Sequence, residues 1–399
     1  MNTYSYRAMK DDGKKLEGMY EANSRDEVVE MITANGFYPL KVEEVTKGKK
    51  TEIRLNNRVT TKDLAIFCRQ LYTMLDAGVS ITNSLNMLAM QLPSPRLRTI
   101  LSEIEESVKK GEMLSVAMKR YKEFPQLLIS MVESGESTGN IDTMMLRMAN
   151  HFEKETKTNN KVKSAMIYPI CLAVVAVAAV MFILTFVMPT FAELFEENGA
   201  DLPFITSAMI GASDFLKSYW FIIVAIIAII VVAIKAYAET EDGKVRFSAL
   251  ALKFPIVANL NKKVIVARFT RTLATLLSAG ISLVQALPIV SAVLGNKIAQ
   301  QDLDRIRERV VRGDGLSAPI AESDIFPDML ASMVRIGEES GALDDILNKT
   351  ADFYEEEVDQ AITQTTELMQ PIVIVIMGIV VGIMVMGIML PMFDMYTIM

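Results

Sequence analysis

The chain has 399 residues, of which 51% are hydrophobic and 22% are charged, and its formal net charge is −7. Basic residues are interleaved with acidic ones and form no basic patch, which argues against nucleic acid as a partner. One histidine and two cysteines far apart in the sequence cannot form a zinc site. The cysteines are expected to be reduced and in cytoplasmic surroundings.

Residues 1–45 are expected to form a small α/β module. Its first residues alternate between apolar and polar, as in a strand, and a turn at 11–14 with a returning strand follows. A capping-box pattern from Ser24 to Glu27 predicts a helix, and a third strand is expected after it. The polar residues 46–60 are interpreted as a linker.

Residues 61–168 are predicted to form a first cytoplasmic bundle of about six helices. Apolar residues recur there with helical spacing, and Thr60 or Thr61 is a candidate N-cap. The Phe-Pro pair that ends at Pro125 is expected to begin a helix. The last helix of the bundle is expected to start at Ile141 and is allowed to run on into the following apolar segment.

Three apolar segments are long enough to cross a bilayer, which takes roughly 20 residues. They are assigned as transmembrane helices at 169–189, 218–237 and 371–392. Aromatic residues stand at both ends of the second segment, where interfacial aromatics are expected. The alternative is that the three segments are buried core helices of a soluble protein.

The distribution of Lys and Arg predicts the orientation of the chain in the membrane. The loop at 190–217 carries several acidic residues and only Lys217 as a basic one, and the tail at 393–399 carries no basic residue. Both segments are therefore expected outside the cytoplasm. The N-terminus and the two long soluble regions are expected inside it.

The second half of the chain repeats the first half without a gap, which indicates one fold used twice. Residues 238–370 are therefore expected to form a second cytoplasmic bundle that copies the first. The middle span has no counterpart, and it would return the chain to the side of the first bundle. The matched pairs, all 202 positions apart, include Gly78 and Gly280, Pro125 and Pro327, Gly139 and Gly341, and Pro189 and Pro391.

These features predict a mainly α fold: a polytopic membrane protein with three transmembrane helices and two homologous cytoplasmic helical bundles, plus a small N-terminal α/β module. The spans carry no ionisable residue at their centres. Transporters and channels usually keep polar or charged groups at that depth, so the apolar spans argue against a transporter. A transporter or channel subunit is nevertheless kept as the competing class, and a sensor or scaffold unrelated to filaments is a third.

Sequence patterns for catalysis are absent, so no catalytic, cofactor-binding or metal-binding residue is assigned and the protein is not expected to be an enzyme. Neither a G-x-x-x-x-G-K-[ST] loop nor a G-x-S-x-G elbow occurs. His151 is interpreted as a surface or helix-seam residue. The acidic run Glu355–Glu357 is interpreted as a solvated helix face, with a divalent cation as the alternative.

Two pairs of opposite charges occur at matched places in the repeats. Arg69 and Arg271 lie on the first helix of each bundle, and Glu136 and Glu338 lie at the turn before the last helix. We expect one ion pair within each bundle, between Arg69 and Glu136 in the first and between their counterparts in the second. The alternative is that all four are independent surface charges.

Several glycines are expected to have structural roles. Those that follow predicted helices are interpreted as left-handed C-caps, a conformation that favours glycine. In the third span, Gly378 and Gly382 form a G-x-x-x-G pattern, which permits close approach of another helix within the chain or between subunits. The expected C-cap glycines are Gly78, Gly139, Gly280 and Gly341.

The doubled motifs resemble those of the PilC/GspF family, the inner-membrane platform proteins of type IV pilus and type II secretion machines. Each repeat also carries Phe-Pro, Gly-Glu-x-x-Gly and two prolines that flank the span. An N-terminal Tyr6-x-Ala8 is similar to the family's leading domain, so the resemblance covers essentially the whole chain. The two copies of the first motif read Phe67-x-Arg69-Gln70-Leu71 with Leu75-x-Ala77-Gly78, and Phe269-x-Arg271 with Leu277-x-Ala279-Gly280.

The resemblance implies a non-enzymatic protein of the bacterial cytoplasmic membrane, and the Lys and Arg distribution gives it a cytoplasmic N-terminus and an extracytoplasmic C-terminus. It implies that the bundles lie beside a hexameric assembly ATPase and that the spans contact pilin or pseudopilin subunits. Inner-membrane alignment proteins, membrane lipids and a second copy in a dimer are further implied partners. The protein would couple ATPase motion to insertion or removal of pilins at the filament base; a type II secretion platform driving pseudopilus assembly is the alternative.

Overall fold

The computed structural model describes residues 2–9, 15–22, 24–44, 58–190 and 204–398. The expected turn at 11–14 and most of the expected linker lie outside these residues. The chain divides into two compact units, Met1–Arg58 and Val59–Met399.

The first unit is a three-stranded antiparallel sheet covered by one helix, as the sequence predicts. Strands β1 (Asn2–Met9), β2 (Lys15–Ala22) and β3 (Tyr38–Glu44) are ordered β2-β1-β3. The Ser24 hydroxyl accepts the N–H of Glu27 and begins α1 (Arg25–Ala34). One face of the sheet and the apolar face of α1 form a small separate core of Tyr4, Ala8, Ala22, Val28, Ile32 and Val42.

The second unit begins with a six-helix bundle. Thr60 and Asp63 form a reciprocal capping box that begins the first of these helices. The first and last helices, α2 and α7, pack along each other. The bundle comprises α2 (Thr61–Asp76), α3 (Ile81–Gln91), α4 (Pro95–Lys109), α5 (Leu114–Met118), α6 (Gln126–Thr138) and α7 (Ile141–Phe182).

The same order returns in the second bundle, where α11 and α16 pack along each other as α2 and α7 do. Its first helix is longer than its counterpart α2: α11 begins at Pro255 and ends at Ser278, and a further helix, α10 (Glu241–Lys253), precedes it. The remaining helices are α12 (Leu283–Val293), α13 (Lys297–Val311), α14 (Ser317–Ala321), α15 (Asp328–Ser340) and α16 (Leu343–Ile398).

The doubled sequence motifs place an aromatic pair in the core of each bundle. Phe67 packs against Phe124 of Phe-Pro with ring centroids 6.0 Å apart, and Phe269 packs against Phe326 at 4.9 Å. Phe67 and Phe269 are fully buried. Burying each side chain contributes about 2 kcal/mol or more to folding.

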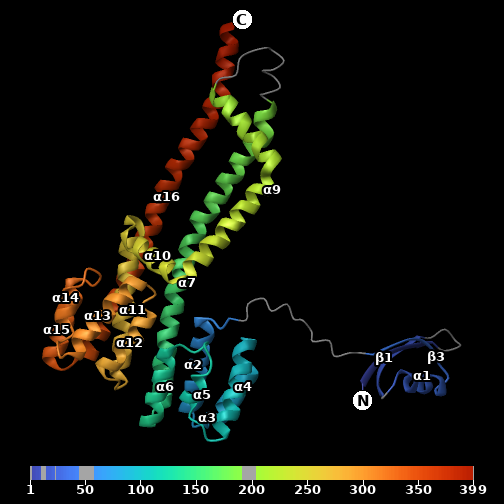
Figure 1. Ribbon diagram of the computed structural model, residues 1–399, viewed down its shortest axis with the longest axis vertical. Helices are drawn as coiled ribbons and strands as arrows, with labels where there is room; N and C mark the ends of the chain where they lie inside the picture. The colour runs from blue at the N-terminus through green and yellow to red at the C-terminus, as the bar shows by residue number, and fades with distance from the viewer. Residues whose placement is uncertain (1, 10–14, 23, 45–57, 191–203, 399) are drawn as a thin grey trace. The chain divides into compact units, whose positions relative to one another are not determined.

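Three helices of the described chain are long and apolar enough to cross a membrane. Helix α7 continues from the first bundle into the first apolar span without a break, and α16 continues from the second bundle into the third span in the same way (Figure 1). Each of these helices has a charged half within its bundle and an uncharged half that could span the bilayer. The third is α9 (Phe204–Glu239).

Part of the segment expected as a loop at 190–217 is helical. The helix α9 begins at Phe204 and bends at Tyr219, where φ is −121° and ψ is 15°. Its first turns meet α16 and the π-helical turn η1 (Ile183–Val187) at the end of the spans remote from the bundles (Figure 1). Met188, Met209 and Met384 form a buried apolar cluster there, and this contact explains why the segment folds as a helix.

Candidate functional site

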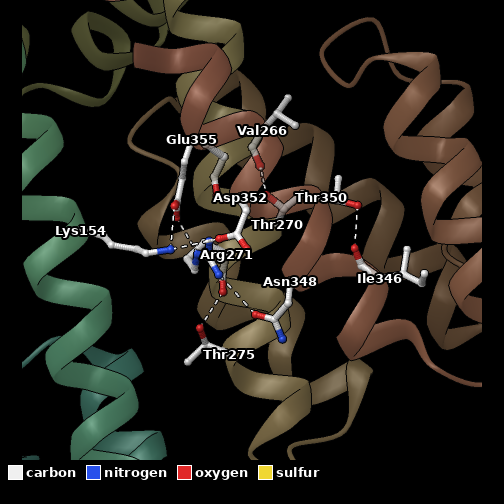
Figure 2. A network of polar contacts seen from close by, with 11 residues as sticks. Lys154, Val266, Thr270, Arg271, Thr275, Ile346, Asn348, Thr350, Asp352 and Glu355 are labelled. Atoms are coloured by element: carbon white, nitrogen blue, oxygen red, sulfur yellow. Dashed lines mark hydrogen bonds and ion pairs between the residues drawn. The ribbon is translucent and has the colours of Figure 1, made fainter. Parts of the chain in front are cut away.

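The two bundles meet through a network of charged residues ahead of the uncharged halves of α7 and α16. Figure 2 shows Lys154 reaching from α7 towards Arg271 on α11 and two carboxylates on α16. Arg271 Nε donates to Glu355 Oε1 at 2.6 Å, and its Nη2 donates to Asp352. Asn348 Oδ1 accepts a further bond at 3.3 Å. We call Lys154, Arg271, Asn348, Asp352 and Glu355 the interbundle network.

Lys154 is the member of this network that comes from the first bundle. Its Nζ lies 2.9 Å from Glu355 Oε2 and 3.2 Å from Asp352 Oδ1. The two carboxylates therefore face two cations, one from each repeat. Charges arranged in this way hold two elements together more effectively than an isolated surface pair.

A simpler version of the network lies at the matched place in the first bundle. Arg69 Nε and Nη2 each donate to the Glu153 carboxylate at 2.8 Å, and Nη2 also donates to Asn150 Oδ1 at 2.6 Å. The hydrogen bonds from Arg69 hold the pKa of Glu153 below its usual range. Asp352 stands at the position that matches Asn150. The second bundle therefore has one more carboxylate at this place, and Lys154 pairs with it.

The expected pairing of Arg69 with Glu136, and of Arg271 with Glu338, is wrong. Glu136 instead accepts the backbone N–H groups of Leu114, at 2.5 Å, and Ser115, at 3.2 Å, at the start of α5. Glu338 does the same for the first N–H groups of α14. The N–H groups of a first helical turn have no partner within the helix, and these two glutamates satisfy them.

Both glycines and the glutamate of the Gly-Glu-x-x-Gly motif have structural roles. Its first glycine, Gly135, lies within α6, and a Cβ there would stand 2.9 Å from the Cα of Ile141. Its glutamate caps α5, and its last glycine, Gly139, ends α6 with φ of +78°. The motif therefore sets how α6 crosses α7, and the second copy repeats this at Gly337 and Gly341.

Replacing Glu136 by alanine is expected to lower the free energy of unfolding by about 2 kcal/mol, because two backbone donors lose a charged acceptor. Thermal unfolding of the full chain in detergent measures the loss. Glu133→Ala is the matched control on α6, since it removes only an exposed ion pair with Lys119 and should cost less than about 1 kcal/mol. Equal losses for the two variants would contradict the capping role.

A second contact between the bundles shows that α7 and α16 run in the same direction. Lys161 on α7 pairs with Asp359 on α16, as Lys154 pairs with Asp352 one heptad earlier. Both pairs are separated by 198 residues, close to the repeat offset, so the helices lie nearly in register. The two bundles therefore hang from the same ends of their spans.

Reversing one of these charges is expected to weaken the contact, and reversing both to restore it. Lys161→Asp should lower the melting temperature measurably, with a free-energy cost of about 0.5–1 kcal/mol because both side chains are about 40% exposed. The double variant Lys161→Asp with Asp359→Lys should recover most of the loss. The effect should shrink in high salt; a double variant no better than the single one would refute a direct pair.

A cavity of about 230 Å³ lies where the bundles meet, lined from α7 by His151 and Glu155 and from α11 by Arg268 and Thr272. Within the described chain, His151 Nδ1 and Thr272 Oγ1 are buried and have no hydrogen-bond partner. Burial, with Arg271 nearby, lowers the pKa of His151 to about 4. Burial also raises the pKa of Glu155. His151 thus lies at a helix seam, the seam between the bundles.

The acidic run on α16 is largely paired rather than free. Glu355 bonds Arg271, and Glu357 Oε2 lies 2.6 Å from Lys263 Nζ on α11. No group of three or more potential metal ligands occurs in the part of the chain that the structure describes. The run therefore docks α16 onto α11.

The other predicted residues fall in two groups. All four expected C-cap glycines have positive φ, and helices α6 and α15 begin directly after Pro125 and Pro327. By contrast, a Cβ on Gly378 or Gly382 would meet nothing within 4 Å, so the G-x-x-x-G pattern packs against no other part of the described chain. A contact between subunits stays a prediction.

Several important residues were missed by reasoning from the sequence. Glu153 and Glu355 are the true partners of the arginines, and their match at the repeat offset could have revealed them. Gly387 makes the close approach expected of the G-x-x-x-G pattern, because a Cβ there would overlap Met209 Sδ. Lys154 has a glutamate as its counterpart, so the repeat pattern itself hides its role.

Comparison with known proteins is consistent along the whole chain. The family described as type II secretion system protein F matches residues 67–189 and 269–391, and its N-terminal domain matches residues 1–43. The chain is 36% identical to the type IV pilus assembly protein PilC of Thermus thermophilus, covering 98% of each chain. It is 33% identical to PilC of Myxococcus xanthus, covering 98% of this chain and 94% of the relative. It is 31% identical to type II secretion system protein F of Xanthomonas campestris, covering 99% and 98%.

Proposed function

Since this chain belongs to the type II secretion system protein F family, a group of multi-pass inner-membrane platform proteins, we propose that it is the platform of a type IV pilus machine. It would couple a cytoplasmic assembly ATPase to insertion or removal of pilin subunits at the filament base. The observation that carries the proposal is the similarity over nearly the full length to pilus assembly proteins, which reaches 36% identity.

The arrangement of the bundles supports a mechanical role. The interbundle network and the Lys161–Asp359 pair join two similar bundles whose last helices continue into the spans. A displacement of one bundle would therefore be passed to the other bundle and along both helices. We place the bundles and the N-terminus in the cytoplasm, which the excess of Lys and Arg on that side of the spans supports.

Complementation tests the proposal directly. Cells that lack this gene should show no surface pili by electron microscopy, and the wild-type gene should restore them. The purified protein in liposomes should stimulate the assembly ATPase or retain it in a pull-down. Normal piliation in the deletion strain would overturn the pilus assignment, and selective solute flux through the liposomes would favour a transporter.

A type II secretion platform is the second candidate. Relatives from that system match over the full length at 30–31% identity, slightly below the 33–36% of several pilus relatives. Loss of secreted enzymes from the medium, with pili intact, would favour this candidate. The partners proposed above would then be pseudopilins and the secretion ATPase.

A further inference from the structure

Each repeat places a proline near the outer end of its span, the end remote from the bundles. Pro189 and Pro391 occupy matched positions in the repeats. Proline has no N–H, so a helix that contains it leaves one upstream carbonyl without its backbone donor. In an apolar environment such a carbonyl must find another donor.

In α16 the carbonyl without a donor is that of Gly387, four residues before Pro391, as α-helical bonding requires. Thr206 Oγ1 on α9 donates to Gly387 O at 2.8 Å, and Thr206 is almost fully buried. The absence of a side chain at Gly387 lets α9 approach this closely, since a Cβ would overlap Met209. The outer end of α16 therefore keeps the α register and is capped by α9.

At the outer end of the first span, in and after η1, the bonding pattern differs by one residue. The turn Ile183–Val187 is π-helical, and the N–H of Met188 donates to Ile183 O, five residues back. In this pattern the backbone N–H of residue 189 would donate to Leu184 O. Pro189 has no N–H, so the carbonyl of Leu184 has no backbone donor. The hydroxyl of Ser213 on α9, also buried, donates to Leu184 O at 2.5 Å.

The unrepeated helix α9 therefore caps both spans with hydroxyl groups seven residues apart on one face. At the repeat offset Gly387 matches Thr185, not Leu184. The two repeats therefore leave different carbonyls without a backbone donor, although their prolines stand at matched positions. The structure thus contains both registers, the α register in α16 and the π register in α7. The Ser213 hydroxyl of α9 thus reaches the carbonyl in η1 that the π register leaves free.

We propose that Ser213 is a positioning residue that selects the π register at the outer end of the first span, and that the α register seen in α16 is a second state of that span. A change of register would turn the residues after Val187 by about 100° about the helix axis. Val187 would then take the place of Met188 in the buried cluster with Met209. The three methionines of that cluster and the adjoining end of α9 would have to repack.

Thiol cross-linking in the full-length protein distinguishes the two registers. In a background with Cys68→Ala and Cys171→Ser, one variant carries Met188→Cys with Met209→Cys, and the other carries Val187→Cys with Met209→Cys. A short bifunctional thiol reagent should cross-link the first pair faster. Adding Ser213→Ala should shift the ratio of the two rates by about fivefold towards Val187, the size expected for losing one hydrogen bond in a membrane protein.

Three further variants keep the test decisive. Ser213→Thr retains the hydroxyl and should retain the ratio, and Thr206→Val removes only the cap of α16 and should leave the ratio unchanged. Pro189→Ala supplies the missing N–H and should shift the ratio in the same direction as Ser213→Ala, without a lost side-chain donor. An unchanged ratio in both Ser213→Ala and Pro189→Ala would overturn the proposal, whatever the protein's role in pilus assembly.

Discussion

Replacing Arg271 by methionine is expected to destabilise the protein far more than the same replacement of Arg69. The Arg271 side chain is 15% exposed and serves both Asp352 and Glu355, so its loss leaves two carboxylates with Lys154 as their remaining cation. Glu355 is 28% exposed and Asp352 is 66% exposed, so the loss of the hydrogen bonds from Arg271 to these two charged groups should cost about 2–3 kcal/mol. Arg69 is 36% exposed and serves one carboxylate, Glu153, so its loss should cost about 1 kcal/mol.

The repeat supplies the control for this comparison, because the two arginines stand at matched positions and have matched glutamate partners. Chemical or thermal unfolding of both full-length variants in the same detergent measures the difference. Adding Asp352→Asn, which makes the second network resemble the first, should reduce the cost of losing Arg271. If Arg69→Met proved as damaging as Arg271→Met, the interbundle network would not be the stronger of the two.

Acidification is expected to destabilise the seam between the bundles through His151. Its pKa lies near 4 in the folded protein and near 6.5 when unperturbed, so between these pH values the unfolded chain binds the proton and the folded chain does not. Stability from this group is therefore present above about pH 6.5 and is lost as the pH falls towards 4. Over that range the loss amounts to about 3 kcal/mol.

The variant His151→Phe isolates this effect, because Phe353 stands at the matched position of the second repeat. The free energy of unfolding of the variant relative to wild type should rise as the pH falls from about 6.5 to about 4. Glu155, whose pKa is raised by burial, acts in the opposite sense in both proteins and so cancels in the comparison. A pH-independent difference would show that His151 is not held neutral at the seam.

Local sequence patterns were sufficient for most of the fold. Alternation predicted the strands of the N-terminal unit, and the capping box at Ser24 predicted its helix. The uncharged runs predicted three spans, and the family match over 67–189 and 269–391 has the same 202-residue offset as the predicted repeat. The segment from Phe204 was mistaken for loop because its helix depends on contact with α16 and η1, which no local pattern reveals.

The candidate site was less predictable, because charge partners are set by how helices pack. A glutamate beside a turn looked like a partner for Arg69, yet the backbone of α5 takes that carboxylate. Lys154 acts on the opposite repeat, so comparing one repeat with the other cannot identify its partners. Residues whose neighbours lie within their own helix were predicted well, and residues that join two bundles were not.

Both bundles should lie on the same face of the membrane and act together. Single cysteines at Ser102 and Asp304, exposed and matched across the repeat, and at Ser207 on the outer part of α9 report the side of each segment in a chain without its native cysteines. A membrane-impermeant maleimide applied to intact spheroplasts should label Ser207→Cys alone, and lysis should expose the other two together. Labelling of Ser102→Cys and Asp304→Cys from opposite sides would show that the bundles lie on opposite faces of the membrane.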